Sequence, residues 1–116
     1  MKTKTFVKTT AIFLLIGGVG GWSARAGDAN ANWSASCAAC HGKDGKGQTM
    51  MGRKLGIKDL TDAKVQAAFD DAQAAKDIKE GVTEDGKEKM KAFGDKYSDD
   101  EIKALVAKVR SFKPAQ

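Results

Sequence analysis

Two cysteines and a histidine lie within five consecutive residues, and these side chains could do chemistry together. The run reads Cys37-Ala38-Ala39-Cys40-His41. Residues three apart on a helical turn share one face, so both thiols can reach the two vinyl groups of one porphyrin and form thioethers. His41 then falls beneath the iron, where an imidazole is an axial ligand. The spacing therefore predicts one covalent haem c, with Cys37 and Cys40 as its attachment residues.

Three other sites use the same residue types. A thioredoxin-like redox pair would follow a strand in a βαβ pattern, and no strand is evident before Cys37. A structural zinc site normally needs four cysteine or histidine ligands, whereas the sequence holds two cysteines and one histidine. A plain structural disulfide between Cys37 and Cys40 stays open as the alternative.

The N-terminus has the three-part plan of a secretory signal. Lys2, Lys4 and Lys8 precede the apolar run 11–16, and the small-residue triplet 24–26 follows it. Sixteen uncharged residues separate Lys8 from Arg25, against about 17 to 25 for a transmembrane helix. We therefore predict a signal peptide over residues 1–26, cleaved after Ala26, and a periplasmic domain over residues 27–116. An uncleaved signal anchor at the outer face of the membrane is the alternative.

The charge and size of the predicted mature chain limit its class. The formal net charge is +5, but residues 1–26 hold four basic and no acidic residues. The mature chain is therefore close to neutral, its basic and acidic residues alternate, and nucleic-acid binding is not expected. About 90 residues make one small domain, and a domain of that size gains from a covalent cofactor as a staple.

The elements that must position the motif are helices joined by loops, which predicts an all-α fold of about four short helices. A first helix is expected over residues 28–40, with Asp28 or Asn30 as N-cap. A second begins at residues 61–64 and turns Val65, Ala68 and Phe69 inward, and a third runs from Asp70-Asp71 to Gly81.

The last helix is the clearest in the sequence. Ser98-Asp99-Asp100-Glu101 forms a capping box, an apolar stripe follows at helical spacing, and Pro114 ends the run. This helix is expected to pack against the one that bears Trp33.

Two segments read as loops. Residues 82–89 are polar, with Gly86 in a turn, and residues 42–56 hold five glycines among basic side chains without periodicity. The second loop is expected to fold over one haem face. It is either a solvated loop or a docking surface for an acidic partner.

The second axial ligand decides between electron transfer and ligand binding. His41 is the only histidine, so bis-histidine ligation is excluded. Met90 is best placed, because it lies between a flexible loop and a capped helix, far enough along the chain to approach from the opposite face. Met50 or Met51, and an open or lysine-bound iron, stay as alternatives, and any of these methionines can simply fill a core.

Two stretches together resemble a small bacterial class I c-type cytochrome across essentially the whole mature chain. They are residues 37–42, near the mature N-terminus, and Met90-Lys91-Ala92-Phe93-Gly94-Asp95-Lys96-Tyr97-Ser98 with the capped helix after it. The resemblance implies Cys37 and Cys40 as thioether sites, His41 as proximal ligand and Met90 as distal ligand. It also implies a single-domain fold in which the N- and C-terminal helices cross beside one haem.

A closed His/Met site leaves no position for a substrate, so we expect a single-electron carrier and not an enzyme. Its partners would be soluble or membrane-bound redox proteins that dock transiently on a monomer, with no small-molecule substrate. A haem-based sensor or binding protein for a diatomic gas is the alternative if Met90 does not bind iron. A haem enzyme such as a peroxidase would need a distal acid or base, and the lone histidine is already used.

Overall fold

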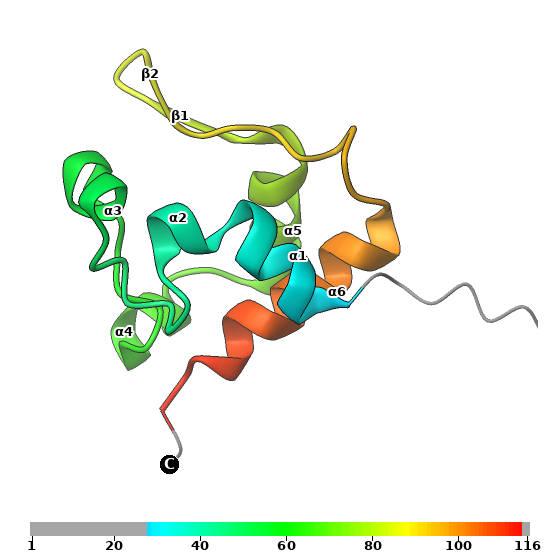
Figure 1. The fold of residues 1–116 in the computed structure, drawn as a ribbon, viewed down its shortest axis with the longest axis horizontal. Helices are drawn as coiled ribbons and strands as arrows, with labels where there is room; N and C mark the ends of the chain where they lie inside the picture. Colours follow the sequence, from blue (N-terminus) through cyan, green and yellow to red (C-terminus); the bar gives the residue numbers. More distant parts are fainter. Residues whose placement is uncertain (1–27, 115–116) are drawn as a thin grey trace, which may run out of the picture.

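The computed structural model describes residues 28–114, so the predicted signal peptide and its cleavage site lie outside the described residues. Six helices and one hairpin make up this part of the chain (Figure 1). The elements are α1 (Ala29–Ser36), α2 (Ala38–His41), α3 (Met50–Leu55), α4 (Ala63–Ala67), α5 (Asp71–Glu80), β1 (Val82–Glu84), β2 (Lys87–Met90) and α6 (Asp99–Ser111). No helix between residues 28 and 114 has both the length and the apolarity to cross a bilayer. The prediction of a small, mainly helical domain is confirmed, although the helices are more numerous and a small sheet is added.

The predicted helix over residues 28–40 is two helices that meet at Cys37. Asp28 caps α1, and its side chain accepts a hydrogen bond from the Asn30 N–H at 3.0 Å. Cys37 is both the last cap of α1 and the first of α2. Backbone bonds run on through the joint, because the Cys37 N–H donates to Trp33 O and the His41 N–H donates to Cys37 O, each at 2.9 Å. The attachment motif therefore occupies a nearly helical turn with a bend at its first cysteine.

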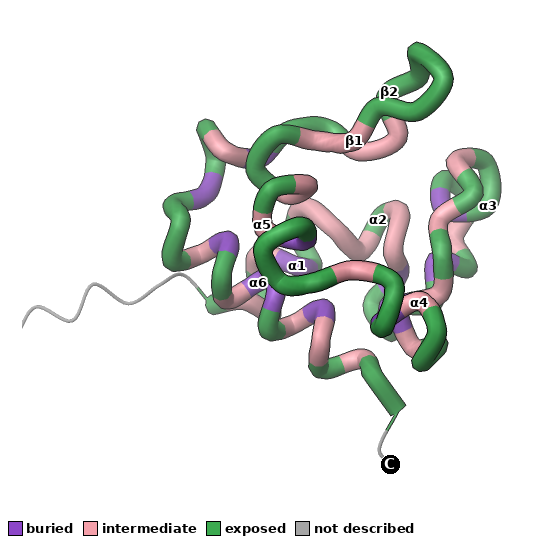
Figure 2. The backbone as a smooth tube through the Cα atoms, turned by 180° about the vertical axis from the view of Figure 1, so that it is seen from behind, coloured by how far each residue is buried: buried purple, intermediate pink, exposed green. Residues whose placement is uncertain are grey.

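Helix α6 packs on α1, as predicted from its apolar stripe (Figure 1). The Ser98 hydroxyl accepts from the Glu101 N–H at 3.2 Å and starts the helix. Leu105 is 1 % exposed and Trp33 is 3 % exposed, and both belong to the same core cluster. Figure 2 shows this buried side of α6 facing the rest of the fold. The packed helices α1 and α6 therefore lie next to the attachment turn.

Aspartates begin the two middle helices, as predicted. Asp62 caps α4 and Asp70 caps α5, and each side chain accepts from backbone N–H groups of the first turn. The prediction that Val65, Ala68 and Phe69 point inward is partly wrong. Val65 and Phe69 are half-buried, but Ala68 is exposed. The polar residue Gln66 is buried in its place.

Gln66 and Arg110 tie α4 to α6. Gln66 Nε2 donates to Leu60 O at 2.7 Å and to Val109 O at 2.8 Å. Arg110 donates in return to Gln66 O at 2.6 Å, to Gln66 Oε1 at 2.9 Å and to Phe69 O at 2.8 Å. The buried amide is thus satisfied on both sides, which a side chain in an apolar interior requires.

Both predicted loops contain regular structure. The segment 42–56 includes α3, which Thr49 caps by accepting from the Gly52 N–H at 2.8 Å. The segment 82–89 is an antiparallel hairpin of β1 and β2, turning at Asp85 and Gly86, both of which have positive φ. The turn at Gly86 was predicted correctly, and the strands beside it were missed.

Candidate functional site

A cavity of about 310 Å³ lies between the attachment turn, α4, α5, α6 and the hairpin. Its volume falls in the range of small-molecule sites in proteins, about 300 to 1,000 Å³. Its walls are mainly apolar. They are formed by His41, Leu55, Gly56, Ile57, Lys58, Leu60, Val65, Phe69, Ala74, Asp77, Ile78, Val82, Glu84, Lys89, Met90 and Val109.

His41 enters the cavity wall from the end of α2. Its ring lies against Trp33, with 5.6 Å between the ring centroids, and the Trp33 indole N–H donates to Gly42 O at 3.0 Å. The indole therefore fixes the backbone just after the histidine. Burial lowers the pKa of His41 below its usual value of 6.5, because desolvation penalises the charged form. A neutral imidazole is the form that binds a metal.

The Nδ1 atom of His41 is buried and has no hydrogen-bond partner among the described residues. A ligating histidine usually donates its second ring N–H to an acceptor that fixes the ring. In this chain the aromatic neighbour of the imidazole is the Trp33 ring, tilted by 40° to it.

Cys37 and Cys40 are half-buried free thiols, and no disulfide joins them. Cys37 packs against the core cluster. Burial raises the pKa of the Cys37 thiol to about 11, although the positive charge of Lys96 acts in the opposite direction. The Cys37 thiol is therefore protonated at neutral pH. A cysteine that reacts as a redox thiolate would instead have a lowered pKa.

Helix α3 supports the attachment turn from outside. The Thr49 hydroxyl donates to Cys40 O at 2.9 Å. Gly52 is buried against the same turn, where an added Cβ would lie 2.5 Å from Cys40 O and would also clash with Gly47 O. This contact was missed from the sequence, although Thr49 as N-cap and Gly56 in the left-handed region are both ordinary helix-end signals.

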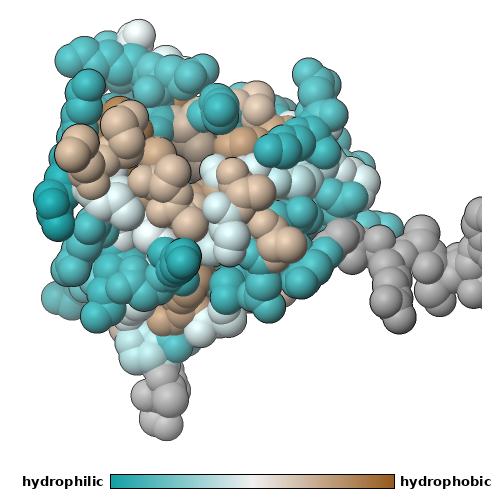
Figure 3. All heavy atoms as spheres, viewed as in Figure 1, coloured by the Kyte–Doolittle hydropathy of each residue, from teal (hydrophilic) through white to brown (hydrophobic). Residues whose placement is uncertain are grey.

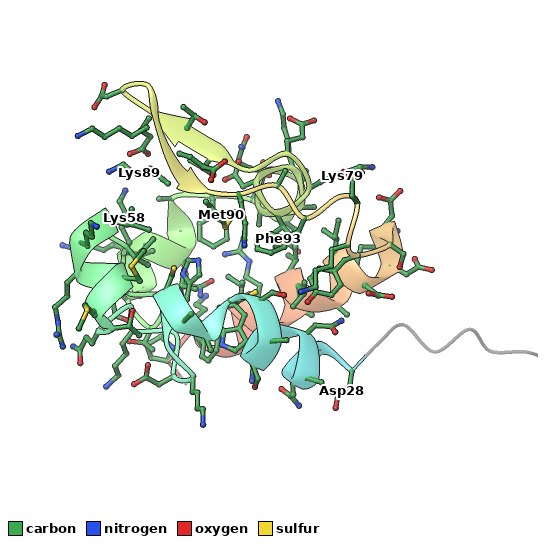
Figure 4. The ribbon with its side chains drawn as sticks, turned by 45° about the horizontal axis from the view of Figure 1, so that its top comes forward. Asp28, Lys58, Lys79, Lys89, Met90 and Phe93 are labelled. Carbon is green, nitrogen blue, oxygen red and sulfur yellow. The ribbon has the colours of Figure 1, made fainter. Side chains whose placement is uncertain are left out.

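The structure places Met90 in the same cavity wall as His41. Met90 ends β2 and is half-buried, and its side chain points from the strand toward the interior (Figure 4). Met50 and Met51 are 85 % and 43 % exposed, and neither lines the cavity. Of the three candidate methionines, one shares the cavity with the histidine.

The backbone around Met90 is anchored to the end of α5. The Phe93 N–H donates to Ile78 O at 2.9 Å, and the Gly94 N–H donates to Lys79 O at 3.0 Å. Gly81 has a φ of +81°, and a Cβ there would lie 2.7 Å from Met90 O. Close packing of this glycine lets the hairpin fold back over the helix end.

The donor set fits an iron porphyrin. Within residues 28–114, no three His, Cys, Asp or Glu side chains converge to hold a metal ion by themselves. The cavity instead brings together one imidazole and one thioether, which are axial donors for haem iron, inside apolar walls that suit a porphyrin. Two thiols lie three residues apart beside the imidazole, as thioether attachment needs.

Comparison with known proteins agrees with this geometry. A family model described as cytochrome c oxidase, cbb3-type, subunit III matches residues 24–107. A solved structure named KustC0563 c-type cytochrome is 34 % identical, with a TM-score of 0.64, and the match covers 75 % of this chain and 99 % of that one. A tyrosine-to-phenylalanine mutant of Kustc0563 is 37 % identical, with a TM-score of 0.65 and coverage of 74 % and 99 %. No curated protein matches at a significant level.

Proposed function

Because the chain belongs to the c-type cytochrome family represented by that subunit III model, we propose that it is a periplasmic single-electron carrier with His41 and Met90 as axial ligands of one haem. Membership of this family makes it a haem-based electron carrier with covalent haem c. The finer assignment is supported by one observation above all: His41 and Met90 line the same cavity, while the other candidate methionines do not.

The residues have separate tasks in this proposal. Cys37 and Cys40 would hold the cofactor as thioethers, and His41 and Met90 would be the ligands of its iron. Bound haem supplies an iron that cycles between the ferrous and ferric states, and thioether ligation favours the ferrous state. Phe69 and Ile78 contribute apolar wall to the cavity.

The carrier needs no catalytic group, so the proposal includes no enzymatic activity. A gas sensor would need Met90 to stay away from the iron. The anchoring of residues 93 and 94 to α5 supports the opposite, because it keeps the end of β2 against the cavity. Export to the periplasm is proposed from the predicted signal over residues 1–26, and the mass of the mature haem protein would test cleavage after Ala26.

We expect Met90→Ala to abolish the weak near-infrared band that sulfur-to-iron ligation gives the ferric protein, because no other thioether lines the cavity. The ferrous variant should then bind carbon monoxide. Absorption spectra of both oxidation states measure this.

Met51→Ala and Met50→Ala are the matched controls and should retain the band. Loss of the band in Met51→Ala would refute the ligand assignment and leave the carrier role intact. Absence of the band in the wild-type protein, with ready binding of carbon monoxide at neutral pH, would refute both.

The partner surface is proposed at α3. Met50 and Met51 are the exposed large hydrophobic side chains among the described residues. Figure 3 shows apolar atoms on this face of the molecule, surrounded by hydrophilic side chains. The segment 43–58 carries Lys43, Lys46, Arg53, Lys54 and Lys58 against the single acid Asp44. A redox protein with an acidic rim around a small apolar contact is the partner that this surface fits.

A further inference from the structure

Two lysines line the cavity that the proposed function assigns to haem. Lys58 follows α3 by three residues, and Lys89 precedes Met90 on β2. The Lys89 ammonium donates to Leu55 O at 3.4 Å, so it reaches from the hairpin across to the segment that carries Lys58. In Figure 4 both lysines lie on one side of Met90, and Lys79 lies on the other side. Two cations therefore gather at one edge of the cavity.

These two cations have no carboxylate partner among the described residues. The ion pairs within residues 28–114 are Lys79 with Asp99 and Arg110 with Asp71, both away from this edge. An unpaired ammonium at the edge of a cavity is a ready site for an anion.

Two carboxylates also line the cavity, and neither forms an ion pair with Lys58 or Lys89. Asp77 accepts a hydrogen bond from Gln73 Nε2 at 2.7 Å. Glu84 is exposed on β1, where its strand partner is Lys87. Both ammonium groups are therefore without a carboxylate contact among residues 28–114.

We propose that Lys58 and Lys89 bind the two propionate carboxylates of the haem. The proposal rests on the proposed function, which puts haem in this cavity. Haem carries two carboxylates on one edge of its ring, and the structure offers two ammonium groups on one edge of the cavity. The pairs would also connect the strand that bears Met90 to the segment after α3 through the cofactor.

Removal of either lysine leaves a carboxylate charge uncompensated near the iron, which favours the ferric state. We therefore expect Lys58→Gln and Lys89→Gln each to lower the equilibrium ratio of ferrous to ferric protein several-fold at a fixed potential, with a larger fall in the double variant. The carboxylate bands of isotope-labelled propionates should shift in the infrared difference spectrum between the two oxidation states. Lys58→Arg and Lys89→Arg retain the cation and should keep both properties near those of the wild type.

Lys87→Gln is the matched control, because it removes a nearby positive charge that does not line the cavity. Equal effects in the control and the test variants, with unshifted propionate bands, would overturn the proposal.

The sulfur-to-iron band separates this proposal from the proposed function. If the wild-type protein shows the sulfur-to-iron band but the propionate bands do not shift in the lysine variants, the lysine assignment alone is refuted. If the wild-type protein lacks the sulfur-to-iron band but its propionate bands shift in both lysine variants, Met90 ligation is refuted and the lysine assignment is supported.

Discussion

Gly52 is the single residue that most tightly constrains the attachment turn. It lies inside α3, where glycine is normally unfavourable by about 1 kcal/mol relative to alanine. The backbone carbonyls of Cys40 and Gly47 occupy the space that a side chain would need. Glycine is present because two backbone segments meet there.

Gly52→Ala should therefore destabilise the protein, whereas the same change in an open helix would stabilise it. An added methyl group against two carbonyls forces α3 away from the turn, at a cost of about 1 to 3 kcal/mol. Urea unfolding of the haem protein measures the change. Equal or greater stability of the alanine variant would show that α3 does not pack on the turn as described.

The residues of the attachment motif could be identified from sequence because their chemistry is local: two thiols and an imidazole act together at fixed spacing. The choice among Met50, Met51 and Met90 rested on their positions along the chain and on the resemblance to class I c-type cytochromes. Lys58 and Lys89 escaped notice, because their common position depends on how the hairpin returns to the end of α3. Charged residues that are brought together only by the tertiary fold form no recognisable pattern in the sequence.

Among the elements, α4 and α6 are joined through one guanidinium. Arg110 donates to two backbone carbonyls, to the Gln66 side chain and to Asp71 Oδ1 at 2.7 Å. Its guanidinium also lies 4.3 Å from the centre of the Phe69 ring. Phe69 lines the cavity, so this contact holds a wall of the site in place.

Arg110→Lys should cost about 1 to 3 kcal/mol of unfolding free energy, because an ammonium cannot reproduce several fixed hydrogen bonds to buried acceptors. Thermal or urea unfolding tests this expectation. Asp71→Asn is the matched comparison and should cost less than about 1 kcal/mol, since the Asp71 side chain is 71 % exposed. If the two variants lose equal stability, the ion pair and not the carbonyl network stabilises the junction.

Helices with an acidic or hydroxyl cap and an apolar stripe were predicted correctly, as at Asp70 and Ser98. Helix α3 was missed because it spans six residues, contains a glycine and turns two methionines to solvent. The hairpin was missed because its strands are short and polar. The Asp85-Gly86 pair is a strong hairpin signal. The turn was predicted from Gly86, but the pairing of the strands on either side of it was not.

Charge is unevenly distributed over the whole molecule despite its near-neutral predicted mature chain. The segment 43–58 is basic, while Asp99, Asp100 and Glu101 begin α6 at another part of the fold. Electrostatic steering depends on such local fields more than on net charge.

Oxidation of the ferrous protein by hexacyanoferrate(III), an anion that accepts one electron, should therefore slow as ionic strength rises. Lys54→Glu should weaken this dependence by removing one cation in α3 and adding an anion. Lys79→Glu makes the same charge change on the far side of Met90 (Figure 4) and should alter the dependence less. Stopped-flow rates over a salt series measure both effects. Equal slopes for the two variants would show that electrons leave through another face.

The closeness of Trp33 to the attachment motif also makes the molecule report on whether its cofactor is attached. The sequence has two tryptophans, and Trp22 lies in the predicted signal. After cleavage, Trp33 is the single indole, and its ring centroid lies 5.6 Å from that of the proposed iron ligand. A haem bound by that histidine would accept the excitation energy of the indole, so the holoprotein should be almost dark in tryptophan fluorescence. Because the haem would be fastened at Cys37, four residues from Trp33, even an extended chain would keep the two within about 14 Å. Emission should therefore stay low when the protein unfolds and should appear only in chains that lack the cofactor, which gives an optical test of haem attachment.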